Sequence, residues 1–127
     1  MRVALAAVAL TLLVVPAAAA WPDAALKVTV WPKGKDGASQ TWTLRCDYPG
    51  PRGTHPRPAA ACRALSRHPG ALKPVPQHVG CTQQWDGPQV ALVRGTFRGK
   101  HIRAWFKRNN GCEIGRWEAL SALLPRD

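Results

Sequence analysis

Two stretches near the beginning of the chain alternate apolar and polar residues. Residues 25–31 read ALKVTVW and residues 41–46 read TWTLRC, a period of two that is typical of half-buried β-strands. Between them, residues 32–37 contain one proline and two glycines, which favour a turn-rich loop. We therefore predict that these two strands pair antiparallel.

A second pair of strands is predicted in the second half of the chain. Residues 90–97 (VALVRGTF) and 100–106 (KHIRAWF) are separated only by Arg98 and Gly99. Because glycine readily adopts the positive φ that a two-residue turn requires, this segment is predicted to be a β-hairpin. The segment 71–79, which carries two prolines, is expected to be extended and irregular.

Two further segments have the features of helices. Residues 58–65 begin with a proline, consist mainly of helix-forming residues and are followed by Gly70, which predicts a short helix. Residues 116–124 carry apolar side chains at helical spacing, which predicts a second helix. Together the patterns predict an α+β domain, in which one or two short helices pack on an antiparallel sheet.

The first twenty residues are not expected to belong to this domain. Arg2 gives a short positive start, an apolar run follows over residues 3–16, and four alanines occupy positions 17–20. This order predicts a signal peptide over residues 1–20 that is removed before Trp21. The run is too short to span a bilayer comfortably, so we expect no membrane anchor and one secreted domain over residues 21–127.

The composition adds a strong positive charge. The chain has 18 Lys and Arg residues against 7 Asp and Glu residues, a formal net charge of +11. Such a balance attracts phosphates, acidic polymers and anionic surfaces. The basic residues are spread along the sequence without aromatic residues interleaved at regular spacing, so no specific nucleic-acid site is predicted.

The chain has four cysteines, at positions 46, 62, 81 and 112, which in an exported chain of this size predict two disulfides. Three connectivities are possible, and pairing of neighbours along the sequence is the simplest. A zinc site is the competing interpretation, but there is no CxxC pair and the four histidines are scattered. We therefore predict no metal site. No cofactor is expected, and since the serines lack the context of a catalytic nucleophile, neither is an enzyme.

Several motifs resemble those of the Streptomyces subtilisin inhibitor family. Residues 46–56, CDYPGPRGTHP, with Cys62 downstream, resemble the Cys-x-PGP-x-GTHP…Cys signature of that family. Residues 81–88, CTQQWDGP, resemble its reactive loop, in which a cysteine precedes the scissile pair and an aromatic-Asp-Pro sequence follows. Residues 110–113, NGCE, fall where the family has Asn-x-Cys-Glu. The resemblance covers nearly all of residues 21–127.

The resemblance implies a fold and an assembly. Family members are secreted homodimers with a five-stranded antiparallel sheet, two helices and disulfides between neighbouring cysteines. For this chain, the resemblance therefore implies a sheet of about five strands, the disulfides Cys46–Cys62 and Cys81–Cys112, and a homodimer. Trp31, Trp42 and Trp105 are expected in the core or, if they face outward, at the dimer interface.

The resemblance also implies a site. Members inhibit subtilisin-like serine proteases with a loop that binds as a substrate does, so the expected partner is an extracellular protease of this type. Gln83–Gln84 becomes the scissile bond, with Gln83 as the P1 residue that enters the protease's S1 pocket. Asn110 becomes the residue that braces the loop from inside. The other loop residues expected to contact the protease are Gly80, Cys81, Thr82, Trp85 and Asp86.

The sequence also departs from the family pattern. Gly87 is an insertion in the reactive-loop motif, and one extra residue lies between the first two cysteines. Glutamine is unusual at P1, and residues 116–124 have a helical pattern where the family has a strand. His55, in the GTHP motif, is expected to brace its loop rather than to bind a metal.

A function from a different class is compatible with the same fold. A non-inhibitory member could be a basic secreted protein that binds acidic polymers or the cell envelope through its charge. Salt distinguishes the two functions, because charge-driven binding weakens steeply with ionic strength. Inhibition through backbone and pocket contacts should survive it.

Overall fold

The computed structural model describes residues 3, 9–14 and 21–127. The alanines of the predicted cleavage site, residues 17–20, lie outside the described residues. Within the described part of the chain, no helix is long and apolar enough to cross a membrane.

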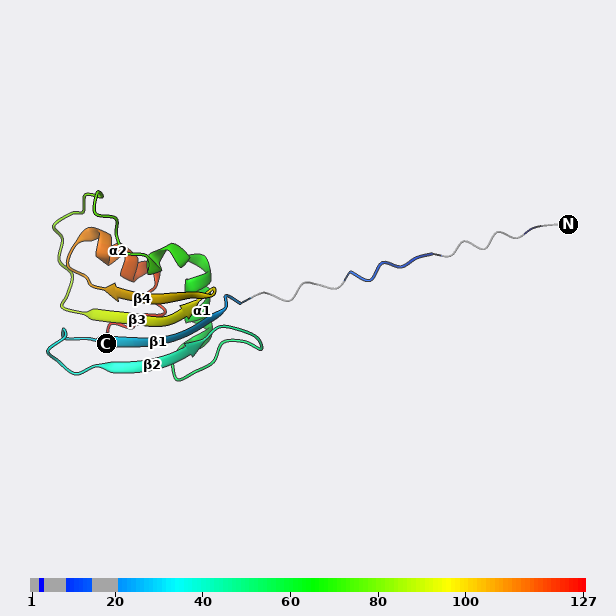
Figure 1. Cartoon of the computed structure of the whole chain (residues 1–127), viewed down its shortest axis with the longest axis horizontal. Helices are drawn as coiled ribbons and strands as arrows, with labels where there is room; N and C mark the ends of the chain where they lie inside the picture. Colours follow the sequence, from blue (N-terminus) through cyan, green and yellow to red (C-terminus); the bar gives the residue numbers. More distant parts are fainter. Residues whose placement is uncertain (1–2, 4–8, 15–20) are drawn as a thin grey trace.

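Four strands form one antiparallel sheet with the order β2-β1-β3-β4 (Figure 1). Their bounds are β1 Ala24–Trp31, β2 Gln40–Arg45, β3 Val90–Phe97 and β4 Lys100–Phe106. Both predicted pairs are confirmed, since β1 pairs with β2 and β3 with β4, and β1 also pairs with β3. The family resemblance implied about five strands. The described residues contain four, because the C-terminal segment forms a helix and turns instead.

Two α-helices and a short 3-10 helix follow the predictions in part. The first helix, α1, spans Pro58–Arg67, and a 3-10 helix, η1, spans Pro69–Leu72. The prediction over residues 58–65 is therefore confirmed. The second helix, α2, spans Gly111–Ala119, so it begins and ends earlier than predicted.

The start of α2 has a local cause. The amide of Glu113 donates a hydrogen bond to Oδ1 of Asn110 (2.9 Å), so Asn110 caps the first turn. Beyond the helix, turns bring Leu120, Leu123 and Leu124 into the core. Their spacing suits a buried turn as well as a helix, which is why the sequence pattern placed the helix too far along the chain.

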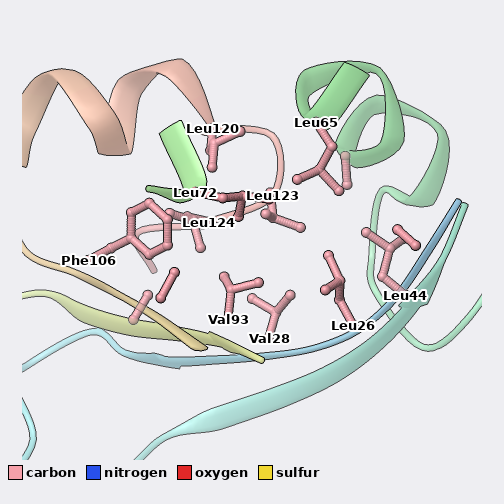
Figure 2. Close-up of a cluster of buried hydrophobic side chains, with 14 of the residues drawn as sticks. Leu26, Val28, Leu44, Leu65, Leu72, Val93, Phe106, Leu120, Leu123 and Leu124 are labelled. Carbon is pink, nitrogen blue, oxygen red and sulfur yellow. The ribbon is translucent and has the colours of Figure 1, made fainter. Parts of the chain in front are cut away.

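The core lies between one face of the sheet and the helical layer. In Figure 2 the strand side chains of Leu26, Val28 and Val93 point toward the leucines of the helical layer, among them Leu65 and Leu120. Burial of each such side chain contributes about 1.5–3 kcal/mol. The helices leave the opposite face of the sheet uncovered.

The three tryptophans in question divide between the two faces. Trp42 lies on the core side, where its ring packs edge-on against that of His55. Trp31 and Trp105 lie on the uncovered face, and their rings stack with centroids 5.9 Å apart. An outward position is thus found for two of the three.

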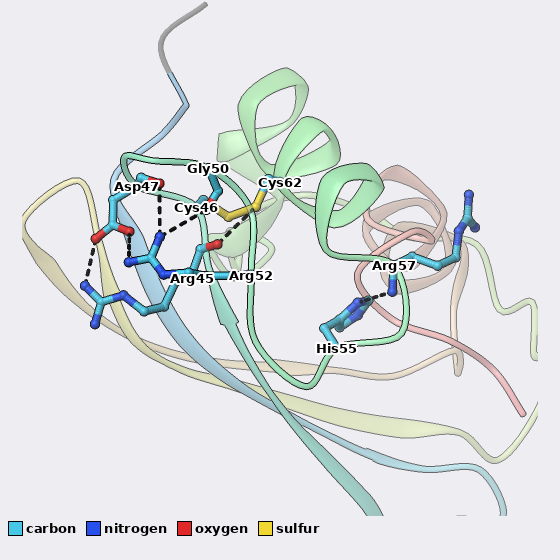
Figure 3. The surroundings of a disulfide bond; sticks show 8 residues. All are labelled: Arg45, Cys46, Asp47, Gly50, Arg52, His55, Arg57 and Cys62. Carbon is cyan, nitrogen blue, oxygen red and sulfur yellow. Dashed lines mark hydrogen bonds and ion pairs between the residues drawn. A yellow bond between two sulfur atoms is a disulfide. The ribbon is translucent and has the colours of Figure 1, made fainter.

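The disulfide Cys46–Cys62 joins the end of β2 to α1, as predicted. Figure 3 shows this corner, with Asp47 placed between Arg45 and Arg52. Both guanidinium groups lie 2.7 Å from the Asp47 carboxylate. The hydrogen bond from Arg45, above all, holds the pKa of Asp47 below its ordinary value. The PGP segment is therefore tied to β2 by charge as well as by the disulfide.

His55 braces the GTHP turn, as predicted. Its ring is buried, Nε2 lies 2.9 Å from the carbonyl oxygen of Leu123, and Nδ1 accepts a hydrogen bond from the amide of Arg57 (3.0 Å). Nε2 must therefore carry the proton and donate it. Burial lowers the pKa of His55 from its ordinary value of 6.5. The neutral ring thus links the turn to the C-terminal segment.

His55 makes the fold sensitive to mild acid. As the pH falls below about 6.5, the unfolded chain binds a proton that the folded chain resists, so the free energy of unfolding should decrease. His55→Gln cannot titrate and should lose this dependence between about pH 7.5 and about pH 5. Urea denaturation at each pH measures the free energy of unfolding. The control is His101→Gln, because His101 is exposed. An unchanged pH dependence in His55→Gln would contradict this assignment.

Candidate functional site

The segment 80–88 connects η1 to β3 and carries the predicted reactive bond. Residues 80–87 have no regular secondary structure, and residues 82–85 are all exposed. In Figure 1 the connection between η1 and β3 loops out beyond α2 and returns along its side. We call residues 80–88 the exposed loop.

The first part of the exposed loop is held by the start of α2. The predicted disulfide Cys81–Cys112 is present, and the amide of Gly111 donates a hydrogen bond to the carbonyl oxygen of Thr82 (3.1 Å). A Cβ at position 111 would lie 2.1 Å from Oγ1 of Thr82, so a larger residue here would displace the Thr82 side chain. These contacts form the Thr82 anchor.

The second part of the exposed loop is held by Arg108. The amide of Asp86 donates to the carbonyl oxygen of Arg108 (2.8 Å), and Nε of Arg108 donates back to the carbonyl oxygen of Asp86 (3.0 Å). The two side chains also form an ion pair through Nη2 of Arg108 and Oδ2 of Asp86. These contacts form the Asp86 anchor, which Arg126 extends from the C-terminus.

Arg108 is almost completely buried, with 1% of its side chain exposed. Nη2 lies 2.8 Å from Oε1 of Glu118 on α2, and the guanidinium carbon lies 5.7 Å from the centre of the Trp117 ring. The hydrogen bond from Arg108 is the main reason why the pKa of Asp86 lies below its ordinary value of 3.8. Asp86 therefore stays ionised, and the anchor intact, at neutral and mildly acidic pH.

Between the two anchors lie only Gln83, Gln84 and Trp85. All three are exposed, and Trp85 exposes 67% of its surface. A three-residue span fixed at both ends has few backbone conformations available, because each residue contributes only two freely rotating backbone dihedrals. The structure therefore presents this short backbone segment outward from two fixed points.

Gly87 lies just beyond the Asp86 anchor. Its φ is +111°, a conformation that glycine adopts without steric cost. Gly87 follows Asp86 in the chain, so it lies outside the three-residue span.

Asn110 has a different contact from the one that the resemblance implied. Its Oδ1 caps α2 by accepting from Glu113. Among the described residues, the hydrogen bonds that hold the exposed loop come from Gly111, Arg108 and Arg126. Asn110 thus fixes the start of the helix from which Gly111 and Cys112 reach the loop.

The sequence reasoning missed Arg108. The ion pair joins residues 22 positions apart, and no spacing rule distinguishes Arg108 from the many other basic residues. The only signal was Asp86 itself, a carboxylate within the reactive-loop motif of a very basic chain.

The comparisons with known proteins identify the class of protein. Residues 22–110 match the family model described as subtilisin inhibitor-like. The chain belongs to this family. It is a family of inhibitors, in agreement with the expectation that the chain is not an enzyme.

Individual relatives agree with this assignment. Kexstatin-1 from Streptomyces platensis is 35% identical over 75 residues, which cover 57% of this chain and 50% of Kexstatin-1. The match thus spans about half the length of that relative. The structure is also similar to Streptomyces caespitosus sermetstatin, solved in complex with Bacillus licheniformis subtilisin, with a TM-score of 0.50 and 24% identity. That similarity covers 81% of this chain and 97% of sermetstatin, and it supports the fold.

Arg108→Met should loosen the exposed loop while the domain stays folded. Methionine keeps much of the apolar packing of arginine but removes both side-chain contacts to Asp86. Amide hydrogen exchange at Asp86, whose amide donates to the carbonyl oxygen of Arg108, should become about tenfold faster or more, because local opening costs less free energy. Arg63→Met, at an exposed position on α1, is the matched control. Unchanged protection in Arg108→Met would show that the side chain does not hold the loop.

Proposed function

We propose that the chain is a secreted inhibitor of subtilisin-like serine proteases that presents Gln83–Gln84 as the scissile bond. The observation that carries the proposal is the exposed three-residue span between the Thr82 and Asp86 anchors. Membership of the subtilisin inhibitor-like family supports it. So does the complex with subtilisin in which sermetstatin, a protein of similar fold, was solved.

The inhibitor needs no catalytic group of its own, because the protease supplies its Ser, His and Asp. The loop binds by adding an extended backbone to the edge of the substrate groove, with the Gln83 side chain in the S1 pocket. Because the two anchors fix the backbone of the span in advance, less conformational entropy is lost when the loop becomes ordered on binding.

The two anchors also explain why cleavage would not release the protease. If the bond after Gln83 were cut, Gln83 would remain next to the Thr82 anchor. The new amine of Gln84 would remain two residues from Asp86. Both ends would stay close to the acyl-enzyme, so that religation competes with hydrolysis. An ordinary substrate has no such second anchor and leaves after cleavage.

Gln83 sets the class of target. Its amide is uncharged, so it cannot form an ion pair with the acidic base of a trypsin-type S1 pocket. It can enter a broad apolar pocket of the subtilisin type at a moderate cost of desolvation. A subtilisin-like protease is therefore the proposed partner.

Secretion is part of the proposal. The two disulfides suit an oxidising compartment outside the cytosol, and the apolar leader predicted over residues 1–20 would direct export. The target would then be an extracellular protease.

Titration of subtilisin with the refolded protein tests the proposed bond. Near-stoichiometric inhibition is expected. Gln83→Lys should shift inhibition toward trypsin, because lysine pairs with an acidic S1 pocket, and Gln83→Pro should abolish it, because proline distorts the extended backbone. Gln77→Lys, exposed and outside the loop, is the matched control. Inhibition that is unaffected by either change at position 83 would place the reactive bond elsewhere.

A double-mutant cycle tests the Thr82 anchor. Gly111→Ala places a Cβ against Oγ1 of Thr82 and should weaken inhibition about tenfold, roughly 1.4 kcal/mol. Thr82→Ala removes that oxygen, so the double variant should regain most of the lost inhibition. Inhibition constants of the four proteins measure the coupling. Strictly additive losses would show that the contact between the two residues does not position the loop.

A further inference from the structure

The helix that holds the exposed loop begins at a chemically reactive bond. The two asparagines of the chain are Asn109 and Asn110, and Gly111 follows the second. Asparagine is among the labile residues of proteins. In an Asn-Gly pair the glycine nitrogen can attack the asparagine side chain with little hindrance, because glycine has no Cβ. Asn110–Gly111 is therefore the place in this chain where spontaneous deamidation is chemically most favoured.

In the folded protein both reacting groups are engaged. The amide of Gly111 donates a hydrogen bond to the carbonyl oxygen of Thr82 (3.1 Å), so the nitrogen keeps its proton and faces the exposed loop. Oδ1 of Asn110 accepts from the amide of Glu113 (2.9 Å), which fixes the side-chain amide at the cap of α2. The Thr82 anchor and the helix cap thus hold the nucleophile and its target in unreactive positions.

The backbone of Asn110 is also in the wrong conformation for the reaction. Ring closure requires the nitrogen of Gly111 and Cβ of Asn110 to be nearly eclipsed about the Cα–C bond. Asn110 is extended, with φ −157° and ψ 170°, so the two atoms are not eclipsed. Rotation about ψ would pull the Gly111 amide away from Thr82. It would also move the carbonyl oxygen of Asn110 away from the amide of Ile114, which donates to it (2.9 Å). The reaction therefore requires the anchor to open.

We propose that Asn110–Gly111 is a latent deamidation site, which is protected while the Thr82 anchor is intact and reacts when that anchor opens. Opening of the anchor is a local event, so the rate of deamidation should follow the fraction of molecules with a detached loop rather than the globally unfolded fraction. The amount of deamidated protein thus measures how long the exposed loop has spent detached.

The reaction needs only water as a co-reactant. In the open state the deprotonated nitrogen of Gly111 attacks Cγ of Asn110. A C–N bond forms, the bond between Cγ and Nδ2 breaks, and Nδ2 takes up a proton and leaves as ammonia, which gives a five-membered succinimide. Water then adds to one of the two ring carbonyl groups and breaks its bond to the Gly111 nitrogen. Opening at Cγ gives aspartate, and opening at the main-chain carbonyl gives isoaspartate.

The two products differ in their effect on the loop. Aspartate at position 110 keeps an oxygen for the helix cap and places a negative charge at the N-terminus of α2, which is favourable. Isoaspartate inserts one more carbon into the main chain just before Gly111, so the Gly111 amide is displaced from Thr82. The exposed loop then loses this hydrogen bond permanently. If the chain is the inhibitor proposed above, the isoaspartyl form should inhibit more weakly.

Peptide mass spectrometry after prolonged incubation in mildly alkaline buffer tests the proposal. It measures deamidation at Asn110 and, as an internal reference, at the exposed Asn109. The folded wild type should deamidate at Asn110 about tenfold or more slowly than the same protein reduced and unfolded in guanidinium chloride. An equal rate in the two states would overturn the proposal, because the folded structure would then give no protection.

Two variants open the Thr82 anchor without changing the reactive pair. Cys81→Ser combined with Cys112→Ser removes the disulfide. Thr82→Gly removes the side chain that covers Gly111 and gives the backbone more freedom. Each should raise the rate at Asn110 about tenfold.

The matched control is Gln77→Gly, which changes an exposed residue outside the loop and should leave the rate at Asn110 unchanged. Opened variants that remain as slow as the wild type would overturn the proposal. So would an equal acceleration at Asn109, because the whole domain would then have opened. Thr82→Gly keeps both disulfides and decides the question if the disulfide variant does not fold.

Inhibition is measured separately on the purified products. The isoaspartyl form should inhibit subtilisin about tenfold more weakly than the aspartyl form. Equal inhibition by the two forms would overturn the stated effect on the loop. If the rate of deamidation follows the anchor but neither the products nor the wild type inhibit subtilisin, the proposed function fails and the deamidation site stands.

Discussion

The proposed activity depends on a single constraint, the fixing of the exposed loop at both ends. The Cys81–Cys112 disulfide and the Gly111 amide hold one end, and the buried side chain of Arg108 holds the other. Each anchor belongs to the same small structural unit, the end of β4 and the start of α2. The sheet and core therefore contribute to the site chiefly by keeping this unit rigid beneath the loop.

Burying Arg108 has a cost that the rest of the structure must offset. Removing a guanidinium group from water is unfavourable unless it is paired, and Nη1 of Arg108 has no hydrogen-bond partner in the described part of the chain. Asp86 and Glu118 supply the compensating charge, and the Trp117 ring lies beside the guanidinium group. Stability and loop geometry are thus coupled through one side chain, so a change at Arg108 would affect both.

Local patterns in the sequence predicted most of the fold. The alternation in β1 and β2, the Gly99 turn and the cysteine order all correspond to observed structure. The position of α2 was predicted wrongly, because the leucines after it are buried by turns. The Asp86 anchor could not be predicted, since it depends on a contact between distant residues.

Mass spectrometry of the protein after long incubation with a small amount of subtilisin tests the central claim most directly. If the loop is held at both ends, hydrolysis should be slow, should occur at Gln83–Gln84 alone and should stop at a mixture of intact and cut protein, because the two ends can rejoin. Rapid and complete cutting, or first cutting at another bond, would contradict the account.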